Sequence, residues 1–139
     1  MMIDSSVLIA ILENEPEAAR LIEAIADDPV HLISAVSVVE TSIVILNRRG
    51  EAGVAELDAF LQEAGIETVA VTPEQATLAR QAYERYGKGR HPAKLNFGDC
   101  FSYAAAVAYD EPLLFKGNDF GETDIACCID WKTNRVQPF

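Results

Sequence analysis

Short apolar segments alternate along the chain with longer segments of helical periodicity, and this alternation constrains the fold more than any other feature. Apolar runs of strand length occur at residues 1–4, 30–34, 66–71 and 113–116. Strands that alternate with helices pair in parallel, because each helix carries the chain back to the starting edge of the sheet. We therefore predict an α/β fold in which helices flank a mainly parallel central sheet.

Capping residues and helix breakers set the expected helix boundaries. Asp4 or Ser5 is a suitable N-cap for the first helix, and Thr72 followed by Pro73 starts a later one. Gly50 is expected to end the most apolar helix. The predicted helices cover residues 5–12, 16–27, 37–49, 51–64, 73–87 and 98–109, and residues 125–128 are expected to add a short edge strand.

Length and composition are those of one globular domain. The chain has 139 residues, 50% of them hydrophobic, which is enough for a full core, so we predict a single domain over residues 1–139. No apolar stretch reaches the ~20 residues of a membrane span, and the N-terminus lacks a signal peptide's basic segment. We expect a cytoplasmic protein without membrane contact. Cys100, Cys127 and Cys128 lack disulfide or zinc spacing and are expected to be small buried hydrophobic residues.

Four acidic residues are the candidates for a functional site. Asp4, Glu40, Asp99 and Asp119 each follow a predicted strand or lie near the start of a predicted helix. In an open α/β fold these positions converge on one edge of the sheet, where ligands bind. Two carboxylates about 4 Å apart repel by roughly 4 kcal/mol at an effective dielectric near 20. Such a cluster therefore requires protons or a divalent cation.

Each acid also has a purely structural explanation. Asp4 is a suitable N-cap, and Glu40 completes a capping box that starts at Ser37. Asp99 is favoured by the dipole at the start of its helix, and Asp119 suits a turn. Each explanation accounts for one acid, but together they do not explain why all four acids occur in this order.

The charge distribution is uneven. A net charge of −11 opposes contact with phosphates, which usually bind Lys and Arg. However, five of the eleven basic residues fall in one window before Asp99: Arg80, Arg85, Lys88, Arg90 and Lys94. This window is either a solvated face or a contact for a phosphate backbone.

Four segments together carry a family resemblance: MMIDSSVLIAIL, ISAVSVVE, LNFGDCFSYAAA and LLFKGNDFGETDI. In this order and spacing the chain resembles the PIN-domain nucleases, most closely the VapC toxins of toxin–antitoxin pairs. The resemblance implies a PIN-like domain in which Asp4, Glu40 and Asp99 hold Mg²⁺ or Mn²⁺. Ser6 resembles the hydroxyl that completes the first motif. The fourth acid is assigned to Asp119, with Asn118 or Asp124 as alternatives.

The implied function is that of a type II toxin, a metal-dependent endoribonuclease. Hard oxygen ligands suit Mg²⁺ and Mn²⁺, which bridge to substrate phosphates. A histidine-pair mechanism is disfavoured, since His31 is expected to be a satisfied core histidine and only His91 could contact phosphate. A catalytically inactive PIN-like binding module is one alternative. A phosphoaspartyl phosphatase is another, but it requires a second Asp where this chain has Ser6.

The resemblance also implies partners. Such toxins form homodimers and bind a cognate VapB-type antitoxin through an apolar groove near the site. The helix expected at residues 37–49 is apolar on nearly every side, as a core or interface helix would be. Such an antitoxin is expected to present an amphipathic helix and an Arg that enters the acidic pocket. Four basic residues are interpreted as RNA contacts: Arg85, Lys88, Arg90 and Lys94.

Overall fold

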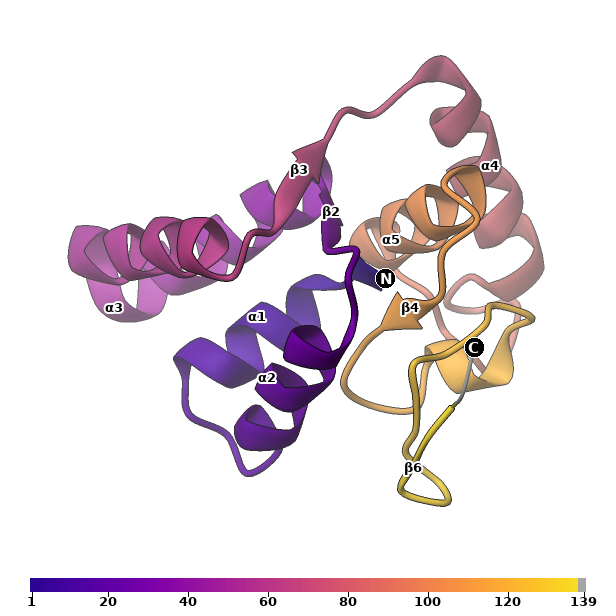
Figure 1. The fold of residues 1–139 in the computed structure, drawn as a ribbon. Helices are drawn as coiled ribbons and strands as arrows, with labels where there is room; N and C mark the ends of the chain where they lie inside the picture. The colour runs from indigo at the N-terminus through magenta and orange to yellow at the C-terminus, as the bar shows by residue number, and fades with distance from the viewer. Residues whose placement is uncertain (138–139) are drawn as a thin grey trace.

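A computed structural model describes residues 1–137, and in that part of the chain a four-stranded parallel sheet has the order β3-β2-β1-β4 (Figure 1). Every strand pairing in this sheet is parallel, which confirms the predicted α/β class. The strands are shorter than the apolar runs that predicted them: β1 Met2–Ile3, β2 Leu32–Ser34, β3 Glu67–Val69 and β4 Leu113–Leu114.

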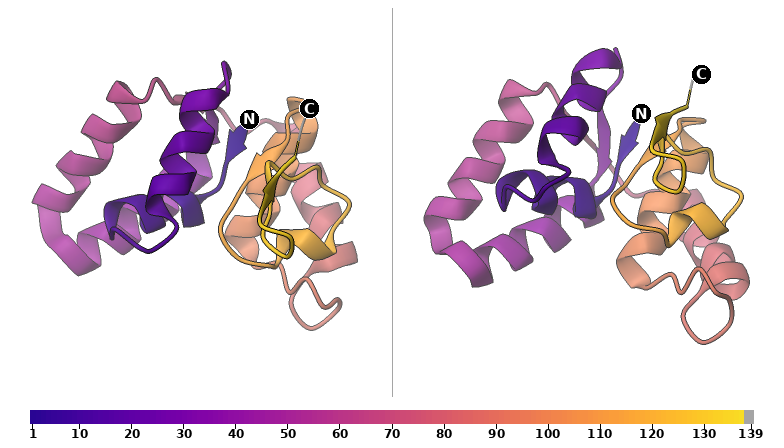
Figure 2. Two further views of the ribbon diagram at one scale, coloured as in Figure 1. Left: turned by 60° about the horizontal axis from the view of Figure 1, so that its bottom comes forward. Right: turned by 90° about the horizontal axis from the view of Figure 1, so that it is seen from below.

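Helices cover both faces of this sheet (Figure 2). The first group lies on one side: α1 Ser5–Leu12, α2 Ala18–Asp27 and α3 Ala35–Glu63. The other side is covered by α4 Pro73–Tyr86 and α5 Phe97–Ala108, and a 3₁₀ turn, η1 Phe120–Glu122, follows β4. None of the helices within residues 1–137 is long and apolar enough to cross a membrane.

Alternate residues of the strands supply two separate cores. Ile3, Ile33 and Leu114 belong to the cluster that also contains residues of α1 and α2. Their neighbours Met2, Leu32 and Leu113 belong to the cluster with α4 and α5. The register pairs like with like, Met2 with Leu32 and Ile3 with Ile33. This two-sided burial explains why the strands are apolar at successive positions.

The long helix α3 differs from the prediction at two points. It begins at Ala35 with Ser34 as N-cap, so the capping box predicted at Ser37 and Glu40 is wrong. The two helices predicted on either side of Gly50 form one element with a kink, because Gly50 has φ 69° and ψ −164° and helical structure resumes after it. A positive φ of this kind favours glycine. The two arms of α3 therefore meet at an angle (Figure 2).

The C-terminal segment also departs from the prediction. Cys127 makes only an isolated parallel bridge to Leu113, so the edge strand predicted at residues 125–128 is wrong. The chain instead forms an antiparallel hairpin from β5 Ile129–Asp130 and β6 Arg135–Val136. The Asp130 carboxylate stabilises the turn by accepting hydrogen bonds from the backbone N–H groups of Lys132 and Thr133.

The predictions for the cysteines and His31 are largely confirmed. Cys100 and Cys128 are buried and Cys127 is half-buried, and all three are free thiols. Both ring nitrogens of His31 lie within hydrogen-bond distance of backbone oxygens, 2.9 Å from Ala64 and 2.5 Å from Asp28. His31 therefore has a structural role, with its ring between two backbone oxygens.

Candidate active site

The first acid, Asp4, lies at the C-terminal end of β1 and is the N-cap of α1. Its side chain is 2% exposed, so its charge requires hydrogen-bond donors. The Ser6 backbone N–H donates to Oδ2 at 3.0 Å, and the Ser102 hydroxyl donates to Oδ1 at 2.5 Å. Asp4 is thus both the predicted cap and a fixed acidic group at the sheet edge.

A chain of buried hydroxyls supports Asp4. The Ser102 oxygen, on α5, lies 3.1 Å from the Ser37 oxygen, on α3, and both residues are 1% exposed. Neither hydroxyl was predicted from the sequence to belong to the site. The available signal was a hydroxyl one turn after Asp99 in an alanine-rich helix.

The second acid, Glu40, contacts the start of α5. A Cβ built on Gly98 would come within 2.6 Å of the Glu40 carboxyl carbon, so the carboxylate fills the space that a side chain would need. The Ser5 hydroxyl donates a hydrogen bond to Glu40 Oε1. Glu40 therefore lies at the positive end of α5, where a carboxylate is favoured. Ser5 and Gly98 were also missed by the sequence analysis.

The third acid, Asp99, forms a capping box with Asn96 at the start of α5. Its Oδ2 accepts from the Asn96 backbone N–H at 3.0 Å, and the Asn96 side chain accepts from the Asp99 N–H at 2.9 Å. Burial, above all, raises the pKa of the Asp99 carboxyl from 3.8 to about 7. The negative charges of Asp4, Asp119 and Glu40 raise it further, while the Asn96 bond lowers it.

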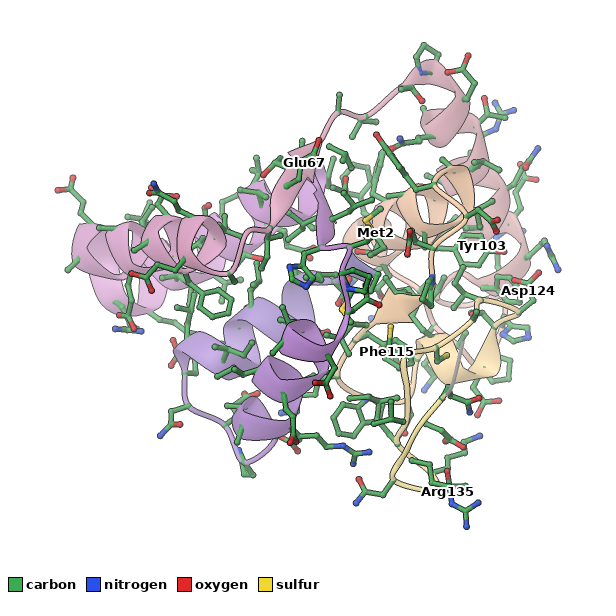
Figure 3. All side chains as sticks on the ribbon, in the orientation of Figure 1. Met2, Glu67, Tyr103, Phe115, Asp124 and Arg135 are labelled. Carbon is green, nitrogen blue, oxygen red and sulfur yellow. The ribbon has the colours of Figure 1, made fainter. Side chains whose placement is uncertain are left out.

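The four predicted acids are therefore close enough to act on one another. Asp119 is exposed, at the start of η1, and reaches this group electrostatically. Asp124, one alternative for the fourth acid, lies in a separate network with Tyr103 and Arg85. Tyr103 and Asp124 are labelled in Figure 3. The Tyr103 hydroxyl donates to Asp124 at 2.6 Å and lowers the pKa of that carboxyl. Asn118, the other alternative, is exposed and faces a neighbouring pocket.

The hydroxyl of Ser6 was expected to complete the first acidic motif, but it hydrogen-bonds to the backbone after β4 rather than to any of the four acids. Its oxygen accepts from the Lys116 backbone N–H at 3.0 Å, which ties α1 to the end of β4. The Lys116 ammonium is held by Glu15 at 2.7 Å and by Glu17 at 3.4 Å. Ser6 thus fixes the segment that leads to Asp119.

The donor set suits a hard divalent cation, although the side chains do not converge on a single point. Among residues 1–137, no three Asp, Glu, His or Cys side chains are arranged to hold a metal ion as they stand. Asp4, Glu40 and Asp99 instead accept hydrogen bonds from serine hydroxyls or backbone N–H groups. Each carboxylate still has further lone pairs, since its two oxygens accept at about four positions. Burial first, and the negative charges of the other three acids second, raise the pKa of Asp99, and a bound cation would offset both effects.

The basic window divides into two parts. Arg85 has internal contacts, an ion pair with Asp124 at 3.6 Å and a hydrogen bond to the Tyr86 hydroxyl at 2.8 Å. Three residues on the loop before α5, which we call the basic loop, are exposed and have no ion pair within residues 1–137: Lys88, Arg90 and Lys94. Gly87 and Leu95 close this loop through a parallel bridge. The basic loop leads directly into the helix that carries Asp99.

Comparison with known proteins defines the class. The model of the PIN domain family matches residues 1–126. Over 126 residues the chain is 56% identical to a ribonuclease VapC of Mycolicibacterium smegmatis, across 91% of this chain and 98% of that protein. The chain therefore belongs to the VapC ribonucleases of the PIN domain family.

Solved structures agree on the fold. The crystal structure of VapC20 of Mycobacterium tuberculosis, a toxin that cleaves the sarcin–ricin loop, superposes with a TM-score of 0.74 at 17% identity. The match covers 90% of this chain and 95% of that chain. A toxin–antitoxin complex from Klebsiella pneumoniae gives a TM-score of 0.66 at 18% identity, across 88% of this chain and 92% of that one. At these identities the likeness concerns the fold alone.

Proposed function

We propose that this chain is the toxin of a toxin–antitoxin pair and an endoribonuclease that depends on Mg²⁺ or Mn²⁺. The observation that carries the proposal is a set of four acids around Asp99: Glu40 lies against Gly98 at the start of α5, and the charges of Asp4, Glu40 and Asp119 act on Asp99. The VapC relatives, which are ribonucleases by name, support the same activity.

The acids Asp4, Glu40, Asp99 and Asp119 would hold the metal. Mg²⁺ or Mn²⁺ bound there supplies Lewis-acid chemistry, which makes water a usable nucleophile and offsets the charge on a phosphate. Oxygen donors of this kind are the ligands that both ions prefer.

The chain's own contribution is to hold these acids in place. Ser102 and the Ser6 N–H fix the two oxygens of Asp4, and Ser5 holds Glu40. The capping box with Asn96 orients the third acid on α5. Neutral donors fix the carboxylates without cancelling their charge, so their attraction for a cation is preserved.

The basic loop would contact the RNA backbone. Its three exposed cations precede the acidic cluster and offset, locally, a net charge of −11. Arg85 would also contact the RNA backbone, because its side chain is 59% exposed and Asp124 and Tyr86 contact only one of its guanidinium nitrogens, Nη2.

The antitoxin would bind in the angle of α3. Val39, Ile43 and Leu46 are 57%, 54% and 49% exposed, and they line a groove between the two arms of the helix. An exposed apolar groove of this kind suits the apolar face of an amphipathic helix. We propose a VapB-type antitoxin as its occupant; the chain shares its fold with a protein solved in a toxin–antitoxin complex.

A second copy of the chain would cover the groove between α4 and α5. Phe97 is 73% exposed there and packs edge-on against Phe101, with the rings 5.0 Å apart. Tyr83 and Cys100 complete an almost wholly apolar lining. The homodimer is testable by analytical ultracentrifugation, in which Phe97→Asp should shift the dimer to monomer.

The activity is tested by incubating the purified protein with RNA, with Mg²⁺, with Mn²⁺ and with a chelator. We expect cleavage only with metal, and products with 5′-phosphate and 3′-hydroxyl ends, because water attacks phosphorus directly. Products with 2′,3′-cyclic phosphate would contradict the mechanism. RNA binding without cleavage in any metal would indicate an inactive PIN-like module, and release of phosphate from phosphomonoesters alone would indicate a phosphatase.

A further inference from the structure

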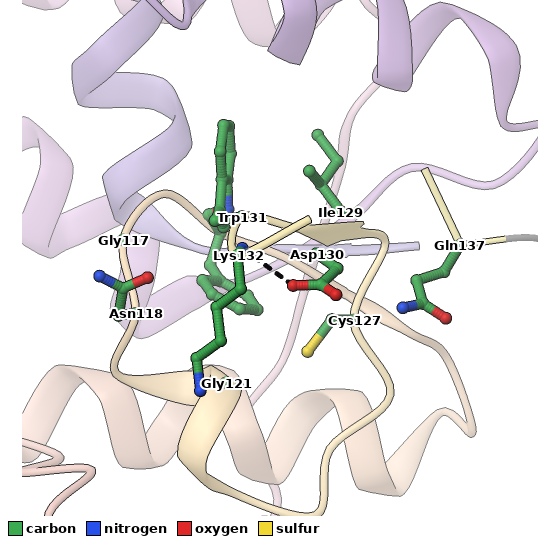
Figure 4. Close-up of a pocket in the computed structure, with 10 residues that line it drawn as sticks. Gly117, Asn118, Gly121, Cys127, Ile129, Asp130, Trp131, Lys132 and Gln137 are labelled. Atoms are coloured by element: carbon green, nitrogen blue, oxygen red, sulfur yellow. Dashed lines mark hydrogen bonds between the residues drawn. The ribbon is translucent and has the colours of Figure 1, made fainter. Parts of the chain in front are cut away.

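A pocket of about 260 Å³ lies between the loop after β4 and the C-terminal hairpin (Figure 4). Phe115, Cys127 and Ile129 form its apolar part, and Asn118, Gly121 and Gln137 stand around it. Its volume is slightly below the range of most ligand sites, roughly 300–1,000 Å³, so it suits a single planar ring system. The hairpin follows residue 126, where the match to the PIN family ends.

The pocket is held open by contacts on both sides of the hairpin. The Trp131 indole N–H donates to the Phe115 carbonyl at 2.7 Å. On α2, the Arg20 guanidinium lies 5.4 Å from the Trp131 ring and donates to the Asn134 carbonyl at 2.7 Å. Lys132 forms an ion pair of 2.9 Å with Glu122 of η1. The hairpin is thus anchored to the body of the protein at three points.

The chemistry of the pocket favours an uncharged polar ring over a phosphate. Lys132 is paired with Glu122, and the Asp130 carboxylate beside it would repel an anion. Within residues 1–137, no hydrogen bond occupies the side-chain amides of Asn118 and Gln137, which stand at opposite sides of Cys127 in Figure 4. Each amide offers donors and an acceptor, the groups that read the edges of nucleobases.

We infer that this pocket binds one nucleobase of the RNA and selects the nucleotide next to the cleaved phosphate. The inference rests on the proposed function for its placement, since Asn118 lines the pocket and its neighbour Asp119 belongs to the acidic cluster. Because Asn118 and Asp119 are neighbours in the chain, the pocket adjoins the segment that carries the fourth acid. A base contact is also useful to a chain of net charge −11, because it adds affinity without cations.

Nucleosides, which carry no phosphate, test the pocket without any cleavage. Trp131 is the single tryptophan of the chain, so its indole N–H gives one assignable NMR signal beside the pocket. We expect adenosine, guanosine, cytidine and uridine at millimolar concentration to shift this signal unequally. Gly121→Leu should abolish the shift, because a side chain there enters open space at the pocket. Arg135→Gln, on the exposed side of the hairpin, is the matched control.

Cleavage of RNA with one randomised position beside the cut is the second readout. The wild type should cleave RNA with the preferred base about ten times faster than RNA with another base, because a wrong base loses contacts in the pocket. In Gly121→Leu this ratio of cleavage rates should fall toward one. The inference would be overturned if all four nucleosides shifted the Trp131 signal equally or not at all. It would also be overturned if Gly121→Leu kept the wild-type shift or the wild-type base preference. If the protein bound nucleosides selectively but cleaved no RNA, the result would support the base-binding pocket and contradict the proposed nuclease function.

Discussion

Replacing Asp99 with Asn tests the acidic cluster most directly. The change removes one negative charge from a group of four and keeps the size and shape of the side chain. An Asn oxygen can still accept the hydrogen bond that the Asn96 N–H donates to the carboxylate, so the capping box is preserved. Any change in stability therefore reports mainly on charge.

The expected gain can be derived from the pKa of Asp99. A rise from 3.8 to about 7 corresponds to at most about 4 kcal/mol of unfavourable free energy for the ionised group. Solvent screening of this partly exposed carboxylate reduces the figure to about 1–2 kcal/mol. Loss of the favourable interaction with the start of α5 offsets roughly 0.5 kcal/mol. The metal-free variant should melt roughly 4 °C above wild type at pH 8.

The pH dependence fixes the sign. The pKa of Asp99 is higher in the folded chain than in the unfolded one, so wild type loses stability relative to the variant as pH rises from about 4 to about 7. Asp124→Asn is the matched control with the opposite sign, because the Tyr103 bond lowers the pKa of that carboxyl. That variant should be less stable than wild type at neutral pH, and the difference should disappear as pH falls.

Thermal melting in a metal titration completes the assay. Mg²⁺ or Mn²⁺ should stabilise wild type by about 2.7 kcal/mol at a hundred times its dissociation constant. The Asp99→Asn variant should gain much less and lose RNA cleavage. Equal metal responses in the two proteins, or a stability difference that does not vary with pH, would remove Asp99 from the cluster.

Three further variants test neighbouring parts of the site. Gly98→Ala should fold at least as stably as wild type, since Ala favours a helix by about 1 kcal/mol over Gly. The added methyl group should displace the Glu40 carboxylate and lower cleavage about a hundredfold. Full activity would show that this contact is dispensable. Ser102→Ala removes a donor to the buried Asp4 and should cost about 1–3 kcal/mol of stability in urea unfolding. It should also raise the Mg²⁺ concentration needed for half-maximal cleavage, whereas a purely structural role would leave that concentration unchanged. Replacing all three residues of the basic loop with Ala should weaken RNA binding and make its salt slope shallower by about 2, while an unchanged slope would identify a merely solvated surface.

The sequence was sufficient for the order and direction of the strands, because their apolar runs and the helices between them leave few alternatives to a parallel sheet. It was not sufficient for the path of α3. A glycine after an apolar helix usually ends it, but at Gly50 a single left-handed residue redirects the chain and the helix resumes. Residue propensity and hydrophobic pattern do not distinguish a helix end from a kink at Gly50, because either outcome places φ > 0 at that glycine.

The acids of the site could be predicted from their positions after strands and near helix starts, but their supporting groups could not. Ser102 contacts Asp4 only because α5 packs against β1 with that side of the helix inward. The role of Gly98 likewise depends on how closely α3 approaches the start of α5. Such contacts are set by the packing of distant segments, which a local sequence pattern does not contain.

The shortness of the strands ties folding to chemistry. With two residues in β1 and two in β4, each of these strands gives one side chain to each core and has no spare length in which to correct an error. A slip by a single residue exchanges the two sides of a strand. It would also move Asp4 away from the edge where the other acids lie, since that residue follows β1 directly. A chain with β1 out of register would therefore lose its core and its nuclease site in the same step, so misfolded molecules of this toxin should be inactive ones.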